Sequence, residues 1–512
     1  MLKLVLGASG SGKTTLLYAR IRARAEAGKR SILLVPEQFT SSTEARIYRE
    51  LGDALSGMVE SYSFTSLAEH ILAVEGGAAV QTLTDAGRAV LVRRALEELQ
   101  DNVHYYYRHR RSAAFCQMAA ETIDELKSAG LSGQQLQELA RDCGTESAKL
   151  GELALIFQGY ESLLAGTGMD PADRLELAAD RLEAALARDE LPDFLREREV
   201  FIDEFDTFNA PKKRLMGAML AALPAVTVAL CEDGAPMQPG DLELFSGAKQ
   251  VAAQLRQLAR KNGAQVAAPE LLRRDLRHKD APGLAALTEL LETGSCTPPE
   301  SAPELRLFAA ASREEEARCA AAAIRRLMRQ GVRCGKIAVV CRDISLYRAA
   351  VRYEFRMAEI PLYCDEPTTP EFSAPATAVR ALLALLRGAD MTEQLTVLAK
   401  TGLCDLTEPE VCALENYAYT WSPNAAAWRA EFTKSPRGFG DAELTEEDTL
   451  NLTRAENARK KLVTAVDTLR SKVRSANAEQ ISRALYFCLK ELGAEEQQAA
   501  QVEDIRTARG IP

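Results

Sequence analysis

The sequence has few of the residues that build disulfide frameworks and zinc-type metal centres. It contains four histidines, and no two of its eleven cysteines are close enough to form a C-x-x-C pair. In a chain of this length, an odd number of widely spaced cysteines favours free thiols in a reducing compartment. The same spacing argues against a metal site built from cysteine and histidine.

Long apolar runs and an excess of positive charge are also missing. No apolar stretch approaches the roughly 20 residues needed to span a bilayer, and the apolar start, Leu2 to Leu6, is too short for the core of a signal peptide. We therefore expect a cytoplasmic protein. The net charge of −10 argues against holding nucleic acid by bulk charge, so any contact with DNA would need local patches.

The first part of the 512-residue chain has the pattern of an α/β domain. Residues 2–6 are expected to form a short buried strand, residues 13–27 a helix and residues 31–35 a second strand, which together make a βαβ unit. From about 63 to 190, apolar residues recur at helical spacing. This segment predicts an all-helical insertion, and a length of 512 residues suggests three or four domains in total.

Strand character returns after the insertion, at residues 199–203 and 225–230. A connection rich in Gly, Ser, Thr and Pro follows around 294–303. A second βαβ unit is then expected, and its parts are a strand at 305–309, a helix at 313–330 and a strand at 336–341. From about residue 374 the pattern is again helical.

The segment that follows the first expected strand carries a phosphate-binding motif. Gly7-Ala-Ser-Gly-Ser-Gly12-Lys13-Thr14 matches G-x-x-x-x-G-K-[ST], and it stands between a strand and a helix as the motif requires. Glycines let successive N–H groups point at phosphate oxygens, and the helix adds its positive end. Lys13 should reach the β- and γ-phosphates, and the Thr14 hydroxyl should bind Mg²⁺. The predicted ATP site comprises Gly7, Ala8, Ser9, Gly10, Ser11, Gly12, Lys13 and Thr14.

An acidic pair is expected to complete this site. The strand Val200-Phe-Ile ends in Asp203 and Glu204, and ligands in open α/β folds bind at the carboxyl ends of strands. Asp203 would join Thr14 as a Mg²⁺ ligand, and Glu204 would polarise the attacking water. The candidate catalytic residues are thus Lys13, Asp203 and Glu204. An ordinary acidic strand-to-helix turn is the alternative.

Two polar loops after strands are candidate contacts for single-stranded DNA. One is Pro36-Glu-Gln-Phe-Thr40 and the other runs from Tyr62 to Leu67. Hydroxyls, amides and stacked aromatic rings are what proteins use to hold a single strand. The candidate DNA-binding residues are Gln38, Phe39, Thr40, Phe64 and Thr65. Core packing is the alternative for both phenylalanines.

Three other runs are interpreted as structural. The aromatic and basic stretch His104 to Arg111 could stack on bases, but packed tyrosines with solvated arginines explain it as well. Arg273-Arg274 with Arg277-His278-Lys279 is interpreted as a solvated face. Trp421 and Trp428 are seven residues apart, which places both on one helical face in a core.

These segments together resemble AddB, the B subunit of the AddAB ATP-dependent helicase–nucleases, and the likeness follows their order along the chain. Residues 305–361 are similar to the second motor lobe of UvrD-like helicases. After the P-loop, Pro36-Glu37-Gln38 is the most specific element. The segments that carry the resemblance to AddB are the N-terminal P-loop, Leu33-Leu-Val-Pro-Glu-Gln-Phe-Thr40, Ser61-Tyr-Ser-Phe-Thr-Ser-Leu-Ala68, Phe115 to Gly130, Gly168-Met-Asp-Pro-Ala-Asp173 and Phe201-Ile-Asp-Glu-Phe-Asp-Thr-Phe208.

The resemblance implies a superfamily 1 helicase-like fold, followed in the full-length family by a nuclease domain with an iron–sulphur cluster. The nuclease carboxylates and the cluster cysteines are not found here, so we expect an N-terminal part of such a subunit. The later helicase motifs, which would supply an arginine finger, are also not found, and Arg342 is one candidate for that role. ATP binding is therefore better supported than hydrolysis by this chain alone.

The predicted fold class is α/β, with two RecA-like P-loop lobes that have parallel sheets and that each carry a mostly helical insertion. The predicted domains are 1–62 plus 195–290 for the first lobe (1A), 63–194 for the helical insertion (1B), 303–373 for the first part of the second lobe (2A) and 374–512 for an incomplete helical region (2B).

The implied function is that of an ATP-binding subunit in a heterodimer that resects DNA double-strand breaks for recombinational repair. Its partners would be DNA and an AddA-type helicase/nuclease subunit, its cofactors ATP and Mg²⁺, and Chi recognition would be part of its work. Two alternatives stay open. One is a stand-alone P-loop ATPase or kinase on a small molecule, which would need only one nucleotide lobe. The other is a non-catalytic scaffold with a vestigial P-loop.

Overall fold

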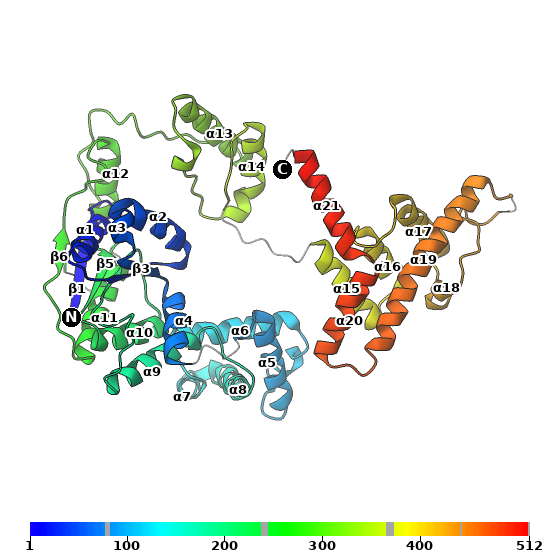
Figure 1. The fold of residues 1–512 in the computed structure, drawn as a ribbon, viewed down its shortest axis with the longest axis horizontal. Helices are drawn as coiled ribbons and strands as arrows, with labels where there is room; N and C mark the ends of the chain where they lie inside the picture. Colours follow the sequence, from blue (N-terminus) through cyan, green and yellow to red (C-terminus); the bar gives the residue numbers. More distant parts are fainter. Residues whose placement is uncertain (77–81, 237–243, 365–372, 441–442, 510–512) are drawn as a thin grey trace. The chain divides into compact units, whose positions relative to one another are not determined.

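A computed structural model describes residues 1–76, 82–236, 244–364, 373–440 and 443–509 of the chain (Figure 1). The chain divides into two compact units, Met1–Phe308 and Ala309–Pro512, and each is described by itself. Among the described residues, no helix combines the length and the apolar character that a bilayer crossing requires.

The first unit is organised around one sheet, in which all neighbouring strands among the described residues run parallel. The strand order is β3-β2-β4-β5-β1-β6. The strands are β1 (Leu2–Gly7), β2 (Ser31–Leu34), β3 (Val59–Tyr62), β4 (Glu199–Ile202), β5 (Ala225–Cys231) and β6 (Glu270–Leu272). The two sides of β5 hold β1 and β4 in register, and this brings the carboxyl ends of β1 and β4 to one edge.

The α/β class and the four strands expected before residue 231 are confirmed, while two strands of this sheet, β3 and β6, were not predicted. β1, β2, β4 and β5 lie where their buried apolar residues placed them. β3 reads Val-Glu-Ser-Tyr and has a single buried residue, and β6 has three residues, none of them buried. Neither segment alternates or runs apolar, so neither carries the signal by which strands are recognised.

Helices cover both faces of the sheet. On one face lie α1 (Lys13–Glu26), α2 (Thr40–Leu51) and α3 (Asp53–Ser56), and on the other lie α4 (Phe64–Glu75), α9 (Asp173–Ala187), α10 (Ala210–Ala222) and α11 (Ser246–Lys261) (Figure 1). Successive residues of a strand point to opposite faces. Accordingly, Leu4 and Leu6 pack in the core beneath α10, whereas Val5 packs with Leu17 and Ile21 of α1. The sheet is thus buried on both faces, as parallel sheets require.

The expected helical insertion is present between β3 and β4. It has its own apolar core, formed by helices α5 (Asp85–Glu98), α6 (Ala113–Ser128) and α8 (Ser147–Leu164), and α7 (Gly133–Ala140) packs on α8. The Thr84 side chain accepts a hydrogen bond from the Gly87 N–H and caps α5, as predicted. Within the described part of the insertion, the single β-type contact is the isolated bridge between Thr82 and Met169.

A buried ionic network ties the helices of the insertion together at Asp170, which is 1% exposed. The Tyr160 hydroxyl donates to the Asp170 carboxylate at 2.8 Å, the Lys127 ammonium lies at 3.4 Å and the Arg88 guanidinium at 3.6 Å. Lys127 also pairs with Asp173 at 2.9 Å. Burial raises the pKa of Tyr160, and the Asp170 charge adds to this shift. The network thus joins α5, α6 and α8 to the start of α9.

In the second unit the expected helix is present, whereas the two strands expected beside it are not. α13 (Arg313–Arg329) packs against α14 (Ile344–Met357). Residues 305–309, at the unit border, and residues 337–341 form no β-ladder within the described parts of the chain, so the prediction of a second βαβ unit is wrong there. Their apolar side chains are exposed, Leu307 fully and Val340 to 90%. An extended segment becomes a strand only when a neighbour supplies hydrogen bonds, and an apolar pattern cannot report that neighbour.

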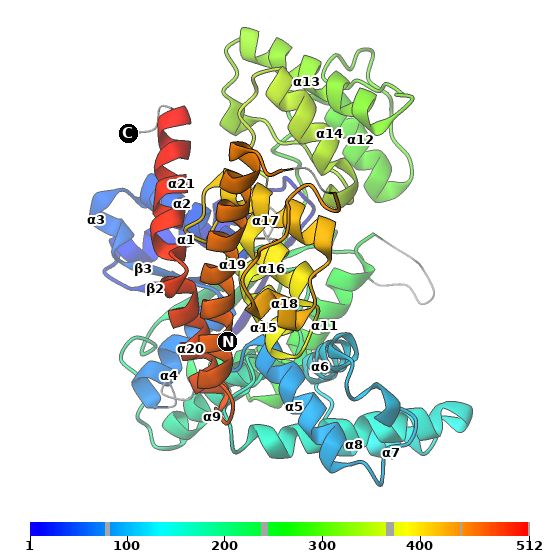
Figure 2. The ribbon, with the colours of Figure 1, turned by 90° about the vertical axis from the view of Figure 1, so that its right-hand side faces the viewer.

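From Ala374 the described residues are helical, as predicted. The helices are α15 (Ala374–Leu386), α16 (Met391–Lys400), α17 (Glu408–Trp421), α18 (Ala425–Arg429), α19 (Glu446–Lys472), α20 (Ala478–Glu491) and α21 (Ala494–Arg509). Figure 2 looks onto α16, α17 and α19, which share one apolar core. The Trp428 ring is fully buried in this core and Trp421 packs at its margin, so core packing is confirmed for both. The prediction that they share one helical face is wrong, because Trp421 ends α17 and Trp428 lies in α18.

We expect Asp170→Ala to lower the free energy of unfolding by about 2 kcal/mol, because it leaves the buried Tyr160 hydroxyl without its acceptor. Arg88 keeps Asp85 and Asp124, and Lys127 keeps Asp173. Urea unfolding followed by circular dichroism measures the change. Asp193→Ala is the matched control, since Asp193 is 95% exposed and pairs loosely with Arg196 at 3.7 Å. It should cost less than about 0.5 kcal/mol. Equal stability of the two variants would contradict a structural role for the network.

Candidate nucleotide-binding site

The glycine-rich loop leaves the carboxyl end of β1 and leads directly into α1, whose first residue is Lys13. Gly10 and Gly12 have φ values of 81° and 92°, in the left-handed region that residues with a side chain rarely adopt. A Cβ atom on Gly10 would also lie 2.9 Å from the Asp275 carboxylate and from the Arg277 Cβ. The motif therefore places glycines where the backbone and its neighbours allow no larger residue.

Lys13 lies across the start of this loop. Its ammonium donates to the carbonyl oxygens of Gly7 at 2.7 Å and Ala8 at 2.8 Å. Burial lowers the pKa of Lys13, while the nearby Asp203 and Cys231 act in the opposite direction. The Lys13 ammonium is thus held beside the start of the P-loop, and its hydrogen-bond acceptors among the described residues are two neutral carbonyl groups.

The structure brings Asp203 together with the P-loop, although the two are far apart in the sequence. Asp203 follows β4 and its N–H donates to the Leu34 carbonyl at 3.1 Å, which holds it at the strand edge. The side chains of Thr14 and Asp203 lie next to each other and line one cavity, and the Glu204 N–H donates to the Asp203 carboxylate at 3.0 Å. Asp203 is 5% exposed, and this burial raises its pKa.

Glu204 is placed differently from Asp203. It is exposed and its φ is 65°, a strained value for a residue with a side chain. Partial loss of solvent around the carboxyl raises the pKa of Glu204, and the neighbouring Asp203 charge raises it further, whereas Arg46 opposes the shift. The two carboxyls therefore differ in exposure, one buried against Thr14 and one facing a cavity.

This cavity, of about 520 Å³, is lined by loop and acidic residues together. Its walls include Gly12, Lys13, Thr14, Arg46, Asp203, Glu204, Asp206 and Arg277. Arg46 comes from α2, and its guanidinium lies 4.7 Å from the centre of the Tyr18 ring on α1. Its place in the site was not predicted, because one basic residue on an amphipathic helix has no distinguishing pattern.

The segment that follows β6 was interpreted as a solvated face. Arg273, Arg274 and Arg277 are exposed, as expected, but the segment also contacts the P-loop, which was not predicted. The Leu276 N–H donates to the Gly10 carbonyl at 3.0 Å, and the Arg277 guanidinium donates to the Ser9 hydroxyl at 3.2 Å. Both residues line the cavity with Lys13. Because this contact joins positions far apart in the chain, no local spacing could have predicted it. Lys279 is exposed, as expected.

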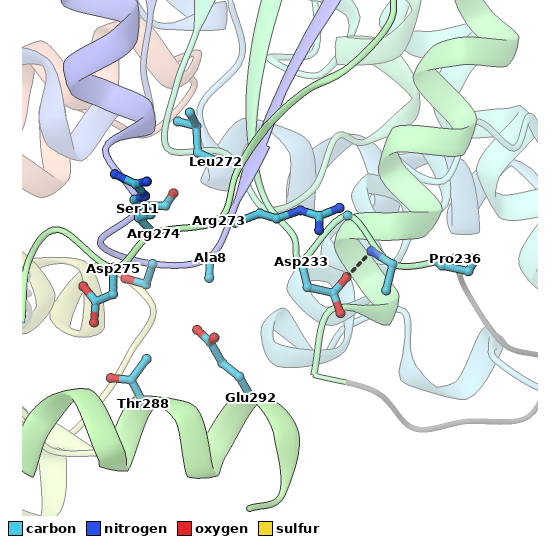
Figure 3. A pocket seen from close by; sticks show the side chains of 13 residues that line it. Ala8, Ser11, Asp233, Pro236, Leu272, Arg273, Arg274, Asp275, Thr288 and Glu292 are labelled. Atoms are coloured by element: carbon cyan, nitrogen blue, oxygen red, sulfur yellow. Dashed lines mark hydrogen bonds between the residues drawn. The ribbon is translucent and has the colours of Figure 1, made fainter. Parts of the chain in front are cut away.

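A second cavity, of about 480 Å³, adjoins the other side of the loop. Figure 3 shows Ala8 and Ser11 of the loop with Leu272 to Asp275 above α12 (Pro282–Thr293), from which Thr288 and Glu292 point toward the loop. Burial raises the pKa of Glu292, as do the charges of Asp275 and Asp233. Ser9 lines both cavities, so the loop stands between them.

The candidate DNA-binding residues lie at the same edge of the sheet, after β2 and β3, but they are not equally accessible. Gln38 and Thr65 are exposed, and Phe39 and Thr40 are half-buried. Phe64 is 2% exposed and packs edge-on against Phe205 at 5.3 Å between ring centres. Phe64 is therefore a core residue, as the alternative interpretation predicted, and its ring is not available to stack on DNA bases.

Two further predictions bear on other sites. Arg342 is exposed in the second unit, and its assignment as an arginine finger stays a prediction. The eleven cysteines are free thiols, and the described residues contain no cluster of three or more His, Cys, Asp or Glu side chains suited to a metal ion. The iron–sulphur cluster therefore has no candidate ligand set among them.

Between His104 and Arg111, both interpretations retain support. The Glu152 carboxylate accepts hydrogen bonds from the N–H groups of His104, Tyr105 and Tyr106, and the Tyr106 ring stacks on Phe115. Tyr105 is 52% exposed. The run is thus anchored by its backbone and by Tyr106 and Tyr107, which pack against the core of the insertion, and it leaves the Tyr105 ring exposed.

The comparisons with known proteins agree with this geometry. A family model described as "ADDB, N-terminal" matches residues 4–288, which include the P-loop, Asp203, Glu204 and Arg277. Proteins named as the B subunit of an ATP-dependent helicase/deoxyribonuclease are similar over most of this chain. One from Moorella thermoacetica is 31% identical over 98% of this chain and 44% of its own length.

Two other relatives with the same name give a consistent result. The protein from Desulforudis audaxviator is 32% identical over 83% of this chain and 37% of its own length. The protein from Symbiobacterium thermophilum is 30% identical over 84% of this chain and 38% of its own length. The chain thus spans less than half the length of each of these relatives. Since the family model covers more than half of its residues, the chain belongs to the AddB family.

Proposed function

We propose that the cavity beside the P-loop binds ATP with Mg²⁺. The observation that carries this proposal is the buried Asp203 carboxylate, which lines one cavity with Thr14 and Lys13. Among the described residues, the Lys13 ammonium there hydrogen-bonds only to carbonyl oxygens. A hydroxyl and a buried carboxylate at one point are oxygen donors of the kind that Mg²⁺ prefers. The chemistry of these residues therefore agrees with the sequence motif. The loop N–H groups and Lys13 are suited to bind the phosphates, and Thr14 and Asp203 are suited to bind the metal.

Each residue has a distinct part in this proposal. Lys13 and the loop N–H groups hold the anionic tail of the nucleotide. Thr14 and the buried Asp203 carboxylate would hold Mg²⁺, while Glu204 faces the cavity and can accept a proton from water. Mg²⁺, when bound, would neutralise charge that develops on the phosphates. If ATP is hydrolysed, Glu204 is the candidate base, and Arg342 of the second unit is the candidate arginine finger.

We further propose that the chain acts as part of an ATP-dependent DNA helicase/deoxyribonuclease. Membership of the AddB family and the name that the relatives share support this. The more specific roles belong to the same proposal, namely resection of double-strand breaks for recombinational repair, Chi recognition and pairing with an AddA-type subunit. Exposed Gln38 and Thr65 are the proposed contacts of the first lobe with a DNA strand.

The predicted domain borders stay part of the proposal. Within the proposed insertion 1B (63–194), α5, α6 and α8 have a separate core, whereas α4 and α9 pack on the sheet of the proposed lobe 1A (1–62 plus 195–290). The border between 2A (303–373) and 2B (374–512) follows residues 365–372, which lie outside the described residues.

We expect Lys13→Ala to weaken ATP binding on the order of 100-fold, because it removes a charge-assisted hydrogen bond to phosphate. Lys29→Ala, which removes an exposed lysine, should leave ATP binding unchanged. Titration of a fluorescent ATP analogue, with and without single-stranded DNA at low salt, measures both variants. A scaffold would show no nucleotide binding at all, and a small-molecule enzyme would ignore DNA. DNA binding that persists in Lys13→Ala supports the DNA-processing function.

Asp203→Asn should abolish the effect of Mg²⁺ on ATP binding while leaving metal-free ATP binding within a few-fold of wild type. The amide keeps the shape of the side chain but lacks the charge that a hard cation requires. Asp193→Asn, at an exposed carboxylate, is the control. Isothermal titration with and without Mg²⁺ distinguishes the two, and a full Mg²⁺ effect in Asp203→Asn would remove Asp203 from the proposed site.

The Mg²⁺ effect should also depend on pH in a defined direction. Because burial raises the pKa of Asp203, its carboxylate takes up a proton at a higher pH than an ordinary aspartate. Only the ionised form binds the metal, so the Mg²⁺ contribution to ATP binding is fully present near neutral pH and is lost on acidification, above the ordinary aspartate range. Titrations across pH measure this loss, and a midpoint at or below the ordinary value would contradict the assignment.

A further inference from the structure

Residues 272–278, here called the strap, lie directly against the P-loop. The Leu276 N–H donates to the Gly10 carbonyl at 3.0 Å, and a Cβ on Gly7 would meet the Leu272 carbonyl oxygen at 2.7 Å. A Cβ on Gly12 would lie 3.1 Å from a Leu276 methyl group. The strap thus contacts the loop at three positions, Gly7, Gly10 and Gly12. These contacts fix the position of the strap's backbone relative to the loop.

Asp275 organises the strap internally. Its carboxylate accepts hydrogen bonds from the Arg277 N–H at 2.9 Å and from the His278 N–H at 3.1 Å, and it contacts the His278 ring nitrogen Nδ1 at 2.8 Å. Burial alone would raise the pKa of Asp275, but the hydrogen bonds from His278 and Arg277 outweigh it and hold that pKa below its ordinary value. The anion of Asp275 is therefore engaged in the turn that aims Arg277.

The Arg277 side chain points back over the loop. Its guanidinium donates to the Ser9 hydroxyl at 3.2 Å, and it lines the same cavity as Lys13, Thr14 and Asp203. Its charge acts to lower the pKa of Lys13, which means that the two cations are close enough to repel each other. No carboxylate of the described residues lies within 4.0 Å of this guanidinium. Two cations with no paired acid thus flank one anion-binding loop.

We propose that Arg277 is a second cationic ligand for the phosphate chain of the bound nucleotide, supplied in cis by the strap. This proposal rests on the proposed ATP site and adds to it a residue outside the P-loop motif. An arginine presents a planar fork of donors that matches phosphate oxygens. The ligand class is a nucleoside polyphosphate, and the contribution of Arg277 should grow with the number of phosphates.

The test compares Arg277→Gln with wild type for binding of ATP, ADP and AMP in the presence of Mg²⁺. Loss of a charge-assisted hydrogen bond predicts an ATP affinity on the order of 10-fold lower, a smaller loss for ADP and none for AMP. Arg277→Lys keeps the charge and should recover part of the ATP affinity. Lys279→Gln is the matched control, because Lys279 is two residues away, exposed and paired only with Asp280 at 4.0 Å; it should bind ATP as wild type does.

Three outcomes would overturn the proposal. Unchanged ATP affinity in Arg277→Gln would show that the guanidinium does not meet phosphate. An equal loss for ATP and AMP, or a lowered melting temperature, would show that Arg277 acts only by holding the loop through Ser9. Failure of the wild type to bind any nucleotide would remove the ATP site itself, and this result is distinct from the other two.

Discussion

The site depends on one constraint, which is that parallel strands deliver their carboxyl ends to a common edge. β1 and β4 are separated in the sequence by the whole helical insertion, yet β5 pairs with both and aligns them. This alignment sets the Thr14 hydroxyl beside the Asp203 carboxylate. The same edge carries the loops after β2 and β3 and the strap after β6, so the P-loop, the acidic pair and the candidate contacts at residues 38–40 and 65 all derive from one sheet.

The long insertion is compatible with this constraint because it is stable in its own right. α5, α6 and α8 share a core, and the buried Asp170 ties them to the start of α9. The chain therefore leaves the sheet after α4 and returns through α9 to β4, and β4 still pairs with β2 and β5. The Gly168–Asp173 segment, part of the family resemblance, thus has a structural explanation in Asp170 and Asp173.

Local pattern was sufficient for the elements whose own residues determine them. The apolar strands β1, β2, β4 and β5 and the P-loop were predictable from a few adjacent residues. Arg277 and Arg46 could not be predicted, because their proximity to the loop arises only when distant segments fold together. The segments around Leu307 and Val340 were wrongly predicted as strands, and both side chains are exposed. An apolar pattern predicts a strand but does not show whether a neighbouring strand is present to supply hydrogen bonds.

Phe205 connects the acidic pair, Asp203 and Glu204, to the start of α4 through a ring contact with Phe64. It directly follows Glu204, and its ring meets Phe64, the first residue of α4, while Phe208 packs against both. Thr65, the exposed candidate for DNA contact, is attached to the backbone of Phe64. Aromatic rings in a close-packed core cannot move independently. The backbone at Thr65 is therefore positioned by the same three-ring cluster that follows the acidic pair, and not by the sheet alone.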